Sequence, residues 1–373
     1  MKNILILSWA PISEYYFKKV YGFDRLLKKY NLIIYDISKI IFKNHKNTIY
    51  LGAKNISAKK FTRLNEYEKK IKKLKINLVI NLTGIRKKHQ LVLPIIKKKI
   101  KIVNFINESL SKNYFYPDKI YYYFKYIFNF FLSKNYHKFN INLIGGTNFQ
   151  NTYVSINSKL IPSHSTNYNS ILINRNKAKK KNYIKQKTAV FIDSGFYFHP
   201  DFYINKNRKI LKNRIFNIKS FSEKINLLFL KLNKMGYKVI FLSHPKVNFT
   251  KQKIYKNCKK VKFNTLEYVK YSDLVFWCGS STIEFPIIYK KKIIILESRE
   301  IDSYPIIKNN LNSYAKYFKV NKFNLDYSDK YETRLKDSII KPSKLYDKYK
   351  IEFIKNCNSR DLIYSKTIEN ILK

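Results

Sequence analysis

Residues 271–298, YSDLVFWCGSSTIEFPIIYKKKIIILES, predict a strand, a tight turn, a short helix and a second strand. Leu274 to Cys278 is an apolar run rich in β-forming residues, which is typical of a strand buried on both faces of a parallel sheet. Gly279-Ser280-Ser281-Thr282 then turns the chain into a helix, with Glu284 in its first turns. The helix must be short, because Ile293 to Leu296 is already another buried strand. The stretch therefore indicates an α/β fold.

The turn after the first of these strands is a predicted anion site. A strand that ends in small residues at a helix N-terminus brings backbone N–H groups, hydroxyls and the positive end of the helix dipole to one point. We expect Gly279, Ser280, Ser281 and Thr282 to hold a phosphate there. Glu284, one helical turn further on, is expected to accept hydrogen bonds from ribose hydroxyls.

A second polar motif lies upstream. Lys238 to Leu242 is another apolar run, and it ends in Ser243-His244-Pro245. Ligands in open α/β sheets bind beyond the carboxyl ends of the strands. We therefore expect the two strands to end side by side and to bring His244 toward Ser280 and Ser281. An imidazolium there would stabilise a phosphate that gains charge as a leaving group departs. The alternative is a helix N-cap and a loop histidine without chemistry.

The alternation of strand and helix runs through the whole chain and predicts two Rossmann-like domains with parallel sheets. The first, acceptor-side domain is expected over residues 1–175, and it includes one helix from Glu14 to Tyr30. A basic linker is expected over residues 176–187 and a nucleotide-sugar-binding domain over residues 188–330. A helical tail over residues 331–373 completes the chain.

The composition is strongly basic. The 373 residues carry 75 Lys and Arg against 24 Asp and Glu, a formal net charge of +51, which favours anionic partners. The lysines are spread along the whole chain together with an excess of Ile, Asn, Tyr and Phe, as AT-rich codons produce, and no RNA-recognition signature occurs. No specific nucleic-acid partner is therefore expected, although a basic RNA-binding protein remains an alternative. Peripheral contact with an anionic membrane surface stays open.

Several classes of site are excluded by missing motifs. The sequence has no dinucleotide-binding glycine fingerprint, no P-loop and no nucleophile elbow. Its six histidines lack the spacing of zinc ligands, so neither a metal nor another cofactor is expected. Three widely spaced cysteines favour a reducing compartment, and the N-terminus is read as a buried strand, so a cytoplasmic location is expected. The apolar run over residues 120–132 is too short to span a bilayer and predicts a buried helix, with an interfacial patch as the alternative.

The two polar motifs, SHP and CGSSTIEFP, resemble those of GT-B-type glycosyltransferases over about residues 236–298. More narrowly, they resemble bacterial sialyltransferases, polysialyltransferases and related capsule or lipopolysaccharide transferases that use CMP-sugars. The resemblance implies that His244 of the HP motif stabilises the nucleotide phosphate as it leaves and that Ser280-Ser281-Thr282 binds this phosphate. It also implies two domains that face each other across a cleft, and a metal-independent reaction. The implied reaction transfers an acidic sugar from its CMP-linked donor to a glycan or lipid-linked glycan, at the cytoplasmic side of a bacterial inner membrane.

The catalytic base of those families is a carboxylate in a tripeptide of two acidic residues followed by glycine, and no such tripeptide stands here. The nearest is Asp193-Ser194-Gly195, and we expect Asp193 or Asp201 to deprotonate the acceptor hydroxyl. A polar loop without a catalytic role is the alternative. Glu108, at the end of a predicted strand of the first domain, is a further candidate. The polar cluster His164-Ser165-Thr166-Asn167-Tyr168 predicts a hinge or an acceptor contact.

Two other functions fit the same motifs. One is transfer of a polyol phosphate from a CDP donor in teichoic-acid-like synthesis, because such enzymes show similar His-Pro and Ser-rich signatures. The other is a non-catalytic nucleotide- or glycan-binding protein of the same fold. Donor binding that depends on His244 and Ser281 would separate all of these from an RNA-binding protein, and turnover would separate an enzyme from a binder.

Overall fold

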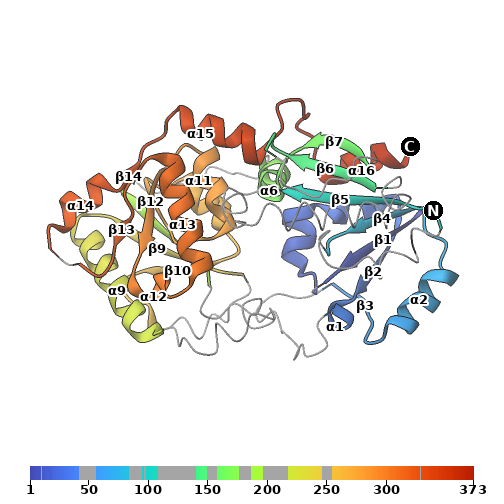
Figure 1. Cartoon of the computed structure of the whole chain (residues 1–373), viewed down its shortest axis with the longest axis horizontal. Coiled ribbons are helices and arrows are strands. Elements are labelled where there is room, and N and C mark those ends of the chain that lie inside the picture. The colour runs from blue at the N-terminus through green and yellow to red at the C-terminus, as the bar shows by residue number, and fades with distance from the viewer. Residues whose placement is uncertain are drawn as a thin grey trace, which may run out of the picture.

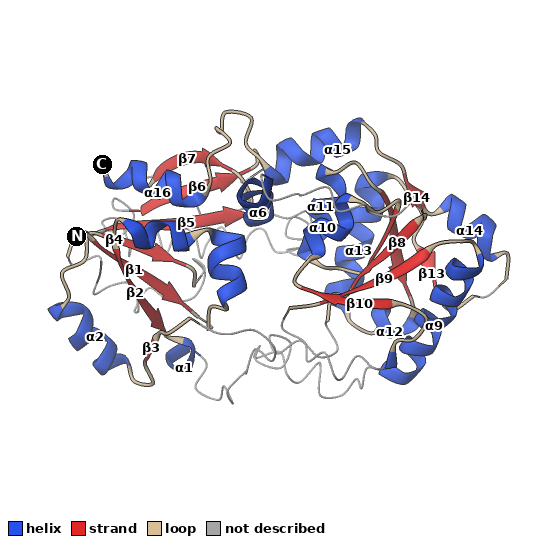
Figure 2. Ribbon diagram, turned by 180° about the vertical axis from the view of Figure 1, so that it is seen from behind, coloured by secondary structure: helices blue, strands red, loops and turns tan. Residues whose placement is uncertain are grey.

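The computed structural model describes residues 1–9, 11–41, 56–83, 95, 98–107, 140–148, 158–175, 186–195, 217–245, 254–327 and 329–373. These residues form two lobes, each built on a mainly parallel sheet with helices packed on it (Figures 1 and 2). The predicted pair of Rossmann-like domains is confirmed.

The first lobe contains an all-parallel sheet in the order β3-β2-β1-β4-β5-β6-β7. Its strands are β1 (Asn3–Ser8), β2 (Asn31–Asp36), β3 (Lys59–Lys60), β4 (Leu78–Asn81), β5 (Lys101–Asn107), β6 (Asn140–Gly145) and β7 (Lys159–Ser163). Its helices are η1 (Tyr16–Tyr21), η2 (Phe23–Lys28), α1 (Ser38–Ile41) and α2 (Leu64–Lys73), and α6 (Thr166–Asn174) follows β7. One apolar cluster covers each face of the sheet, which explains why its strands read as apolar runs.

The single helix expected from Glu14 to Tyr30 is wrong. Gly22 adopts a left-handed conformation with φ of 69° and ends η1 there, and the 3₁₀ helix η2 follows it. A residue with positive φ cannot continue a right-handed helix. The apolar side chains of both short helices still face the core, because Phe17, Val20, Phe23 and Leu26 are all buried.

The second lobe contains a sheet in the order β10-β9-β8-β11-β12-β13, with β14 antiparallel beside β12. Its strands are β8 (Thr188–Ile192), β9 (Lys238–Ser243), β10 (Lys259–Lys262), β11 (Leu274–Trp277), β12 (Lys292–Glu297), β13 (Phe323–Asn324) and β14 (Ile339–Ile340). Its helices are α9 (Ile218–Lys234), α10 (Thr265–Lys270), η5 (Ser281–Ile283), α11 (Glu284–Ile288), α12 (Arg299–Asp302), α13 (Pro305–Phe318), α14 (Tyr331–Asp337), α15 (Lys344–Tyr349) and η6 (Lys350–Ile354). The strand order reverses between β8 and β11, as in doubly wound folds.

A row of buried asparagine side chains crosses the first sheet. Asn81 Nδ2 donates to Asn104 Oδ1 at 2.8 Å, and Asn104 Nδ2 donates to Asn142 Oδ1 at 3.1 Å. Asn142 Nδ2 donates in turn to Ser158 Oγ at 2.8 Å. The three amides stand in register on β4, β5 and β6, so each strand supplies the partner that the next buried amide needs.

The C-terminal segment returns to the first lobe. Ser165 N donates to Ile354 O at 2.6 Å and Asn356 N to Ser163 O at 3.0 Å, so the outgoing and returning chains run antiparallel where they cross. The last helix, α16 (Tyr364–Leu372), then packs in the core under β1 and β4. Figure 1 shows both chain ends on this lobe. The tail is helical only in pieces, because β14 joins the second sheet.

The remaining predictions about organisation are only partly covered by the described residues. Most of the predicted linker, residues 176–187, lies outside them, so the domain boundaries stay a prediction. The predicted apolar helix over residues 120–132 also lies outside. Within the described ranges, no helix has the length and apolar character needed to cross a bilayer.

Candidate functional site

The strands at which the order of the second sheet reverses end level with one another. Ile192 at the end of β8 pairs with Trp277 of β11 on one side and with Leu242 of β9 on the other. Ligands in doubly wound folds bind beyond the carboxyl ends of the strands at such a reversal. We call this place the crevice and define it by the segments that leave the three strands, residues 193–195, 243–245 and 278–282.

The expectation that the strands before His244 and Ser280 end side by side is wrong. β8 lies between β9 and β11, and neighbouring strands are ~4.8 Å apart, so the two strand ends are separated by roughly 10 Å. Asp193 and Ser194 leave β8 in the space between them. A ligand that contacts both predicted motifs must therefore extend across two strand spacings. His244 and Pro245 are half-buried at one end of this span.

The turn after β11 has a fixed geometry. Gly279 has φ of 107°, a conformation that residues with a side chain rarely adopt. Trp277 Nε1 donates to Ser280 O at 2.6 Å. Ser280 Oγ accepts from Thr282 N at 3.3 Å and lies 2.8 Å from Thr282 Oγ1, so Ser280 caps η5. Ser281 is exposed, and its hydroxyl is therefore better placed than that of Ser280 to contact a ligand.

The residues after β8 lie between the other two segments of the crevice. Asp193 is 2% exposed, and its Oδ1 accepts from Gly195 N at 2.9 Å. Ser194 Oγ lies 3.4 Å from Cys278 Sγ. Burial, and to a lesser degree the nearby Asp193 carboxylate, raises the pKa of the Cys278 thiol to about 12, so this cysteine is a neutral packing group near pH 7. The other predicted bases, Asp201 and Glu108, lie outside the described residues.

Glu284 is directed toward the first lobe. Its Oε2 accepts from Ser165 Oγ, the N-cap of α6, and only 9% of the residue is exposed. Burial raises the pKa of the Glu284 carboxyl to about 7, although hydrogen bonds from Ser165 and Asn167 oppose that rise. Asn167 Nδ2 also donates to Ser281 O at 3.0 Å. The ribose contact of Glu284 stays a prediction. To make it, the carboxyl would have to give up its hydrogen bond from Ser165 and accept one from a ribose hydroxyl.

The polar cluster that contains Ser165 lies where the two lobes meet. His164 is 1% exposed, and its ring stacks on Tyr364 with 5.0 Å between centroids. His164 Nε2 lies 2.8 Å from Leu362 O, and Tyr364 OH donates to His164 O at 2.7 Å. Burial lowers the pKa of His164, which makes it a neutral structural group. Its partners stand about 200 positions later in the chain, so no local sequence pattern predicts them.

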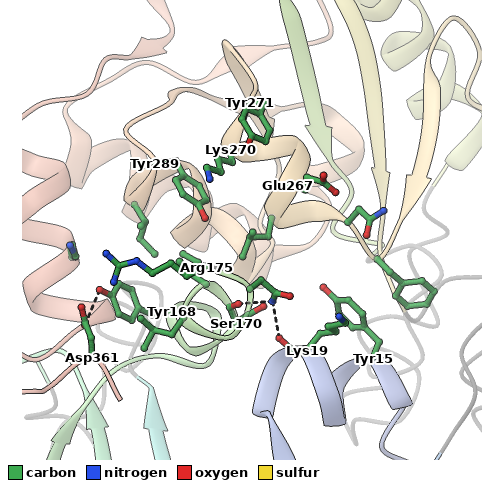
Figure 3. Close-up of a pocket in the computed structure, with 18 residues that line it drawn as sticks. Tyr15, Lys19, Tyr168, Ser170, Arg175, Glu267, Lys270, Tyr271, Tyr289 and Asp361 are labelled. Carbon is green, nitrogen blue, oxygen red and sulfur yellow. Dashed lines mark hydrogen bonds between the residues drawn. The ribbon is translucent and has the colours of Figure 1, made fainter. Parts of the chain in front are cut away.

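A cavity of about 560 Å³ lies beside the same junction (Figure 3). Its wall combines residues of η1, α6, α10 and the end of α11, and this volume is typical of small-molecule sites. Tyr15 of the first lobe meets Phe263 of the second at this wall, with 5.1 Å between ring centroids. The cavity is not predictable from the sequence, because its lining residues come from distant segments of the chain. Among the described side chains, no group of three or more His, Cys, Asp or Glu residues could hold a metal ion.

Comparisons with known proteins support the fold. No protein-family model and no curated protein sequence matches the chain. An S. aureus MnaA structure with UDP is similar over 100% of this chain and 96% of that one, with 10% identity and a TM-score of 0.52. A structure from Listeria monocytogenes assigned as UDP-N-acetylglucosamine 2-epimerase is similar over 99% and 95%, with 7% identity and a TM-score of 0.51. At such identities the likeness shows the fold alone, and it is the predicted GT-B-like fold; the narrower sialyltransferase resemblance is not shown.

Proposed function

We propose that this chain is a glycosyltransferase that moves a sugar from a nucleotide donor to a bacterial surface glycan. The observation that carries the proposal is the crevice at the strand-order reversal of the second sheet. There the capped turn of Gly279 to Thr282 and the Ser281 hydroxyl lie across β8 from His244. The GT-B-like fold supports a nucleotide-sugar ligand. So do the two similar solved structures, because one contains UDP and the other is assigned as a UDP-N-acetylglucosamine 2-epimerase.

In the proposed reaction, backbone N–H groups of the turn after Gly279 and the Ser281 hydroxyl bind the donor phosphate. The bond between the anomeric carbon and the phosphate oxygen breaks, and its electron pair stays on the phosphate. His244, as an imidazolium, stabilises that developing charge. The acceptor oxygen bonds to the anomeric carbon, and its proton passes to a carboxylate. Asp193, Asp201 and Glu108 remain the candidates for this base.

The donor proposed first is a CMP-linked acidic sugar, because the SHP and CGSSTIEFP motifs resemble those of CMP-sugar transferases. The proposed reaction uses no metal and takes place at the cytoplasmic face of the inner membrane, where the +51 charge would favour contact with anionic lipids. Transfer of a polyol phosphate from a CDP donor and non-catalytic binding remain alternatives on the same motifs. An epimerase of UDP-sugars is a further candidate, favoured by the fold likeness to the Listeria monocytogenes structure.

Nucleotide binding by the full chain tests the proposal. A ligand that binds only the folded state raises the melting temperature according to its concentration relative to Kd. We expect CMP to stabilise the wild type and the control Ser57→Ala, whose serine is exposed on the first lobe. This effect should vanish in His244→Ala and Ser281→Ala. Equal stabilisation of all four proteins would show that the nucleotide binds outside the crevice. If none of CMP, CDP, UMP, UDP and GDP raised the melting temperature, the proposal would be refuted.

Product analysis separates the reactions. A transferase consumes its donor only when a glycan acceptor is present and forms a new glycosidic bond. An epimerase interconverts two nucleotide sugars without an acceptor, and a binding protein changes neither substrate. Nuclear magnetic resonance spectra of the donor with and without acceptor oligosaccharides therefore identify the activity. Tighter binding of UDP than of CMP would leave the crevice as the nucleotide site but would identify the donor as a UDP-sugar.

A further inference from the structure

The cavity between the lobes, which we call the interlobe pocket, is separate from the crevice. As far as the structure describes the chain, none of its lining residues belongs to the crevice segments. Figure 3 shows Lys19 of η1 and Tyr15, the residue before η1, on one side of the pocket. Tyr168 of α6 and Arg175, the residue after α6, also line it, as do Lys270 at the end of α10 and Tyr271 after it. Both lobes therefore supply its wall, and an occupant would contact both.

The wall of the pocket has an excess of positive charge. Four cationic and two acidic side chains line it. Within the described part of the chain, Arg175, Lys270 and Lys350 form no ion pair with a carboxylate. Lys270 Nζ instead lies 5.4 Å from the ring centroid of Tyr271, and Lys350 Nζ lies 5.8 Å from that of Tyr168. An anion in the pocket would be the carboxylate or phosphate partner that these three cations lack among the described residues.

The two carboxylates on the wall do not supply that partner. Asp361 Oδ1 accepts from Tyr168 OH at 3.1 Å and lies 2.8 Å from Lys355 Nζ. Glu267, in the first turn of α10, is also not free. As far as the structure describes the chain, Arg175, Lys270 and Lys350 therefore remain open to an anionic ligand.

The uncharged part of the wall contains five aromatic rings among aliphatic and small polar side chains. Tyr15 and Phe263 pack against each other across the lobes, and Tyr271 and Tyr289 add two further rings from the second lobe. Aromatic faces attract the C–H groups that one face of a pyranose ring presents, because their quadrupole is negative above the ring. Cations beside aromatic rings are thus suited to a ligand that has both a ring and an acidic group.

We propose that the interlobe pocket binds one anionic sugar unit, a pyranose that carries a carboxylate or a phosphate. Its ring would lie on the tyrosines of the second lobe, and Arg175 and Lys270 would contact the anion. Asn167 contacts Ser281 of the crevice, and the next residue, Tyr168, lines the pocket. Because α6 has nine residues and is therefore ~13 Å long, the pocket lies within about one helix length of the crevice.

This geometry also suggests the origin of the ligand. Under the proposed transferase function, the anionic unit belongs to the acceptor glycan, and the pocket selects acidic acceptors. That assignment rests on the proposed function, whereas the binding site itself does not. Since the walls come from both lobes, a bound unit also links the lobes across the junction.

Binding of small probes to the full chain tests the proposal by calorimetry. Glucuronate and glucose 6-phosphate carry a ring and an anion, glucose carries only the ring, and inorganic phosphate only the anion. We expect both anionic sugars to bind at millimolar concentration and glucose and phosphate to bind more weakly. Arg175→Gln and Lys270→Gln each remove one charge-assisted contact and should weaken binding about ten- to a hundredfold. The matched control is Lys336→Gln on α14, which should bind like the wild type.

The crevice variant His244→Ala separates this site from the nucleotide site. It should bind glucuronate as the wild type does while it loses the response to nucleotide. The proposal is overturned if no anionic sugar binds, if glucose binds equally well, or if folded Arg175→Gln and Lys270→Gln both bind normally. Loss of sugar binding in His244→Ala would also overturn it, because the sugar would then occupy the crevice. Failure of nucleotide to bind would refute the proposed function alone and would leave this site standing.

Discussion

Gly146 permits the contact between the first lobe and the returning C-terminal segment, and its replacement by alanine should loosen that contact. Gly146 has φ of 82°, and a Cβ there would stand 2.3 Å from Glu352 O. The left-handed conformation costs alanine about 1–2 kcal/mol. The Cβ would also push apart the hydrogen bonds from Thr147 N to Ile351 O and from Asn148 N to Glu352 O, each worth about 1 kcal/mol. Together these effects predict a loss of about 3–4 kcal/mol.

Gly236 provides the matched control for this substitution. It has nearly the same φ, 81°, but no atom lies within 4 Å of a Cβ placed there. Gly236→Ala should therefore cost only the conformational part, about 1–2 kcal/mol. The difference between the two variants isolates the contact with Glu352.

Urea unfolding followed by tryptophan fluorescence measures both variants. The two tryptophans report on different lobes, because Trp9 follows β1 and Trp277 ends β11. In single-tryptophan backgrounds, Gly146→Ala should lower the transition seen by Trp9 more than the one seen by Trp277. Equal costs for the Gly146 and Gly236 variants would show that the backbone contact with the returning segment does not contribute, and the reasoning would fail.

Two further predictions concern buried polar groups. Burial raises the pKa of Glu284 to about 7, so between about pH 4.5 and 7 the folded chain keeps a proton that the unfolded chain releases. The free energy of unfolding should therefore fall as the pH rises through this range, by about 3 kcal/mol in total. Glu284→Gln, which still accepts from Ser165, should lack this slope in urea unfolding at pH 5 and pH 8; parallel pH profiles would contradict the assignment. Asn104→Leu would leave a buried donor on Asn81 and a buried acceptor on Asn142 and should cost about 2–4 kcal/mol in the same assay; a neutral effect would show that the amide row is dispensable.

The central strands were predictable because burial on both faces requires unbroken apolar runs. The segments around Phe191, Phe241 and Ile294 are of this kind, and each became a central strand. The edge strands were missed for the opposite reason. β10 has the sequence KKVK and none of its residues is buried, and lysines on edge strands prevent pairing with other chains. In sequence such a strand resembles a polar loop.

The position of each motif at a strand end was predictable from the sequence, but the arrangement of the motifs relative to each other was not. The Gly279 turn and His244 were placed correctly at the carboxyl ends of strands, because small and polar residues interrupt the apolar runs there. The order of strands is a property of the whole sheet, so nothing near either motif indicates that β8 separates them. Ser165, which donates a hydrogen bond to Glu284, stands 119 positions away in the sequence. Only the folded structure therefore reveals that Glu284, predicted to contact the ribose, is hydrogen-bonded to the first lobe.

The return of α16 to the first lobe has a consequence for biosynthesis. Tyr364, Ile368 and Leu372 fill the core beneath strands that are made hundreds of residues earlier, such as β1. Domains generally fold in the order in which they emerge from the ribosome, but this first lobe lacks one of its core helices, α16, until residues 364–372 have been translated. The second lobe has all of its sheet strands earlier, by residue 340. The lobe that begins the chain is therefore the one completed last, and until then the apolar side chains that α16 covers are accessible to chaperones and to other nascent chains.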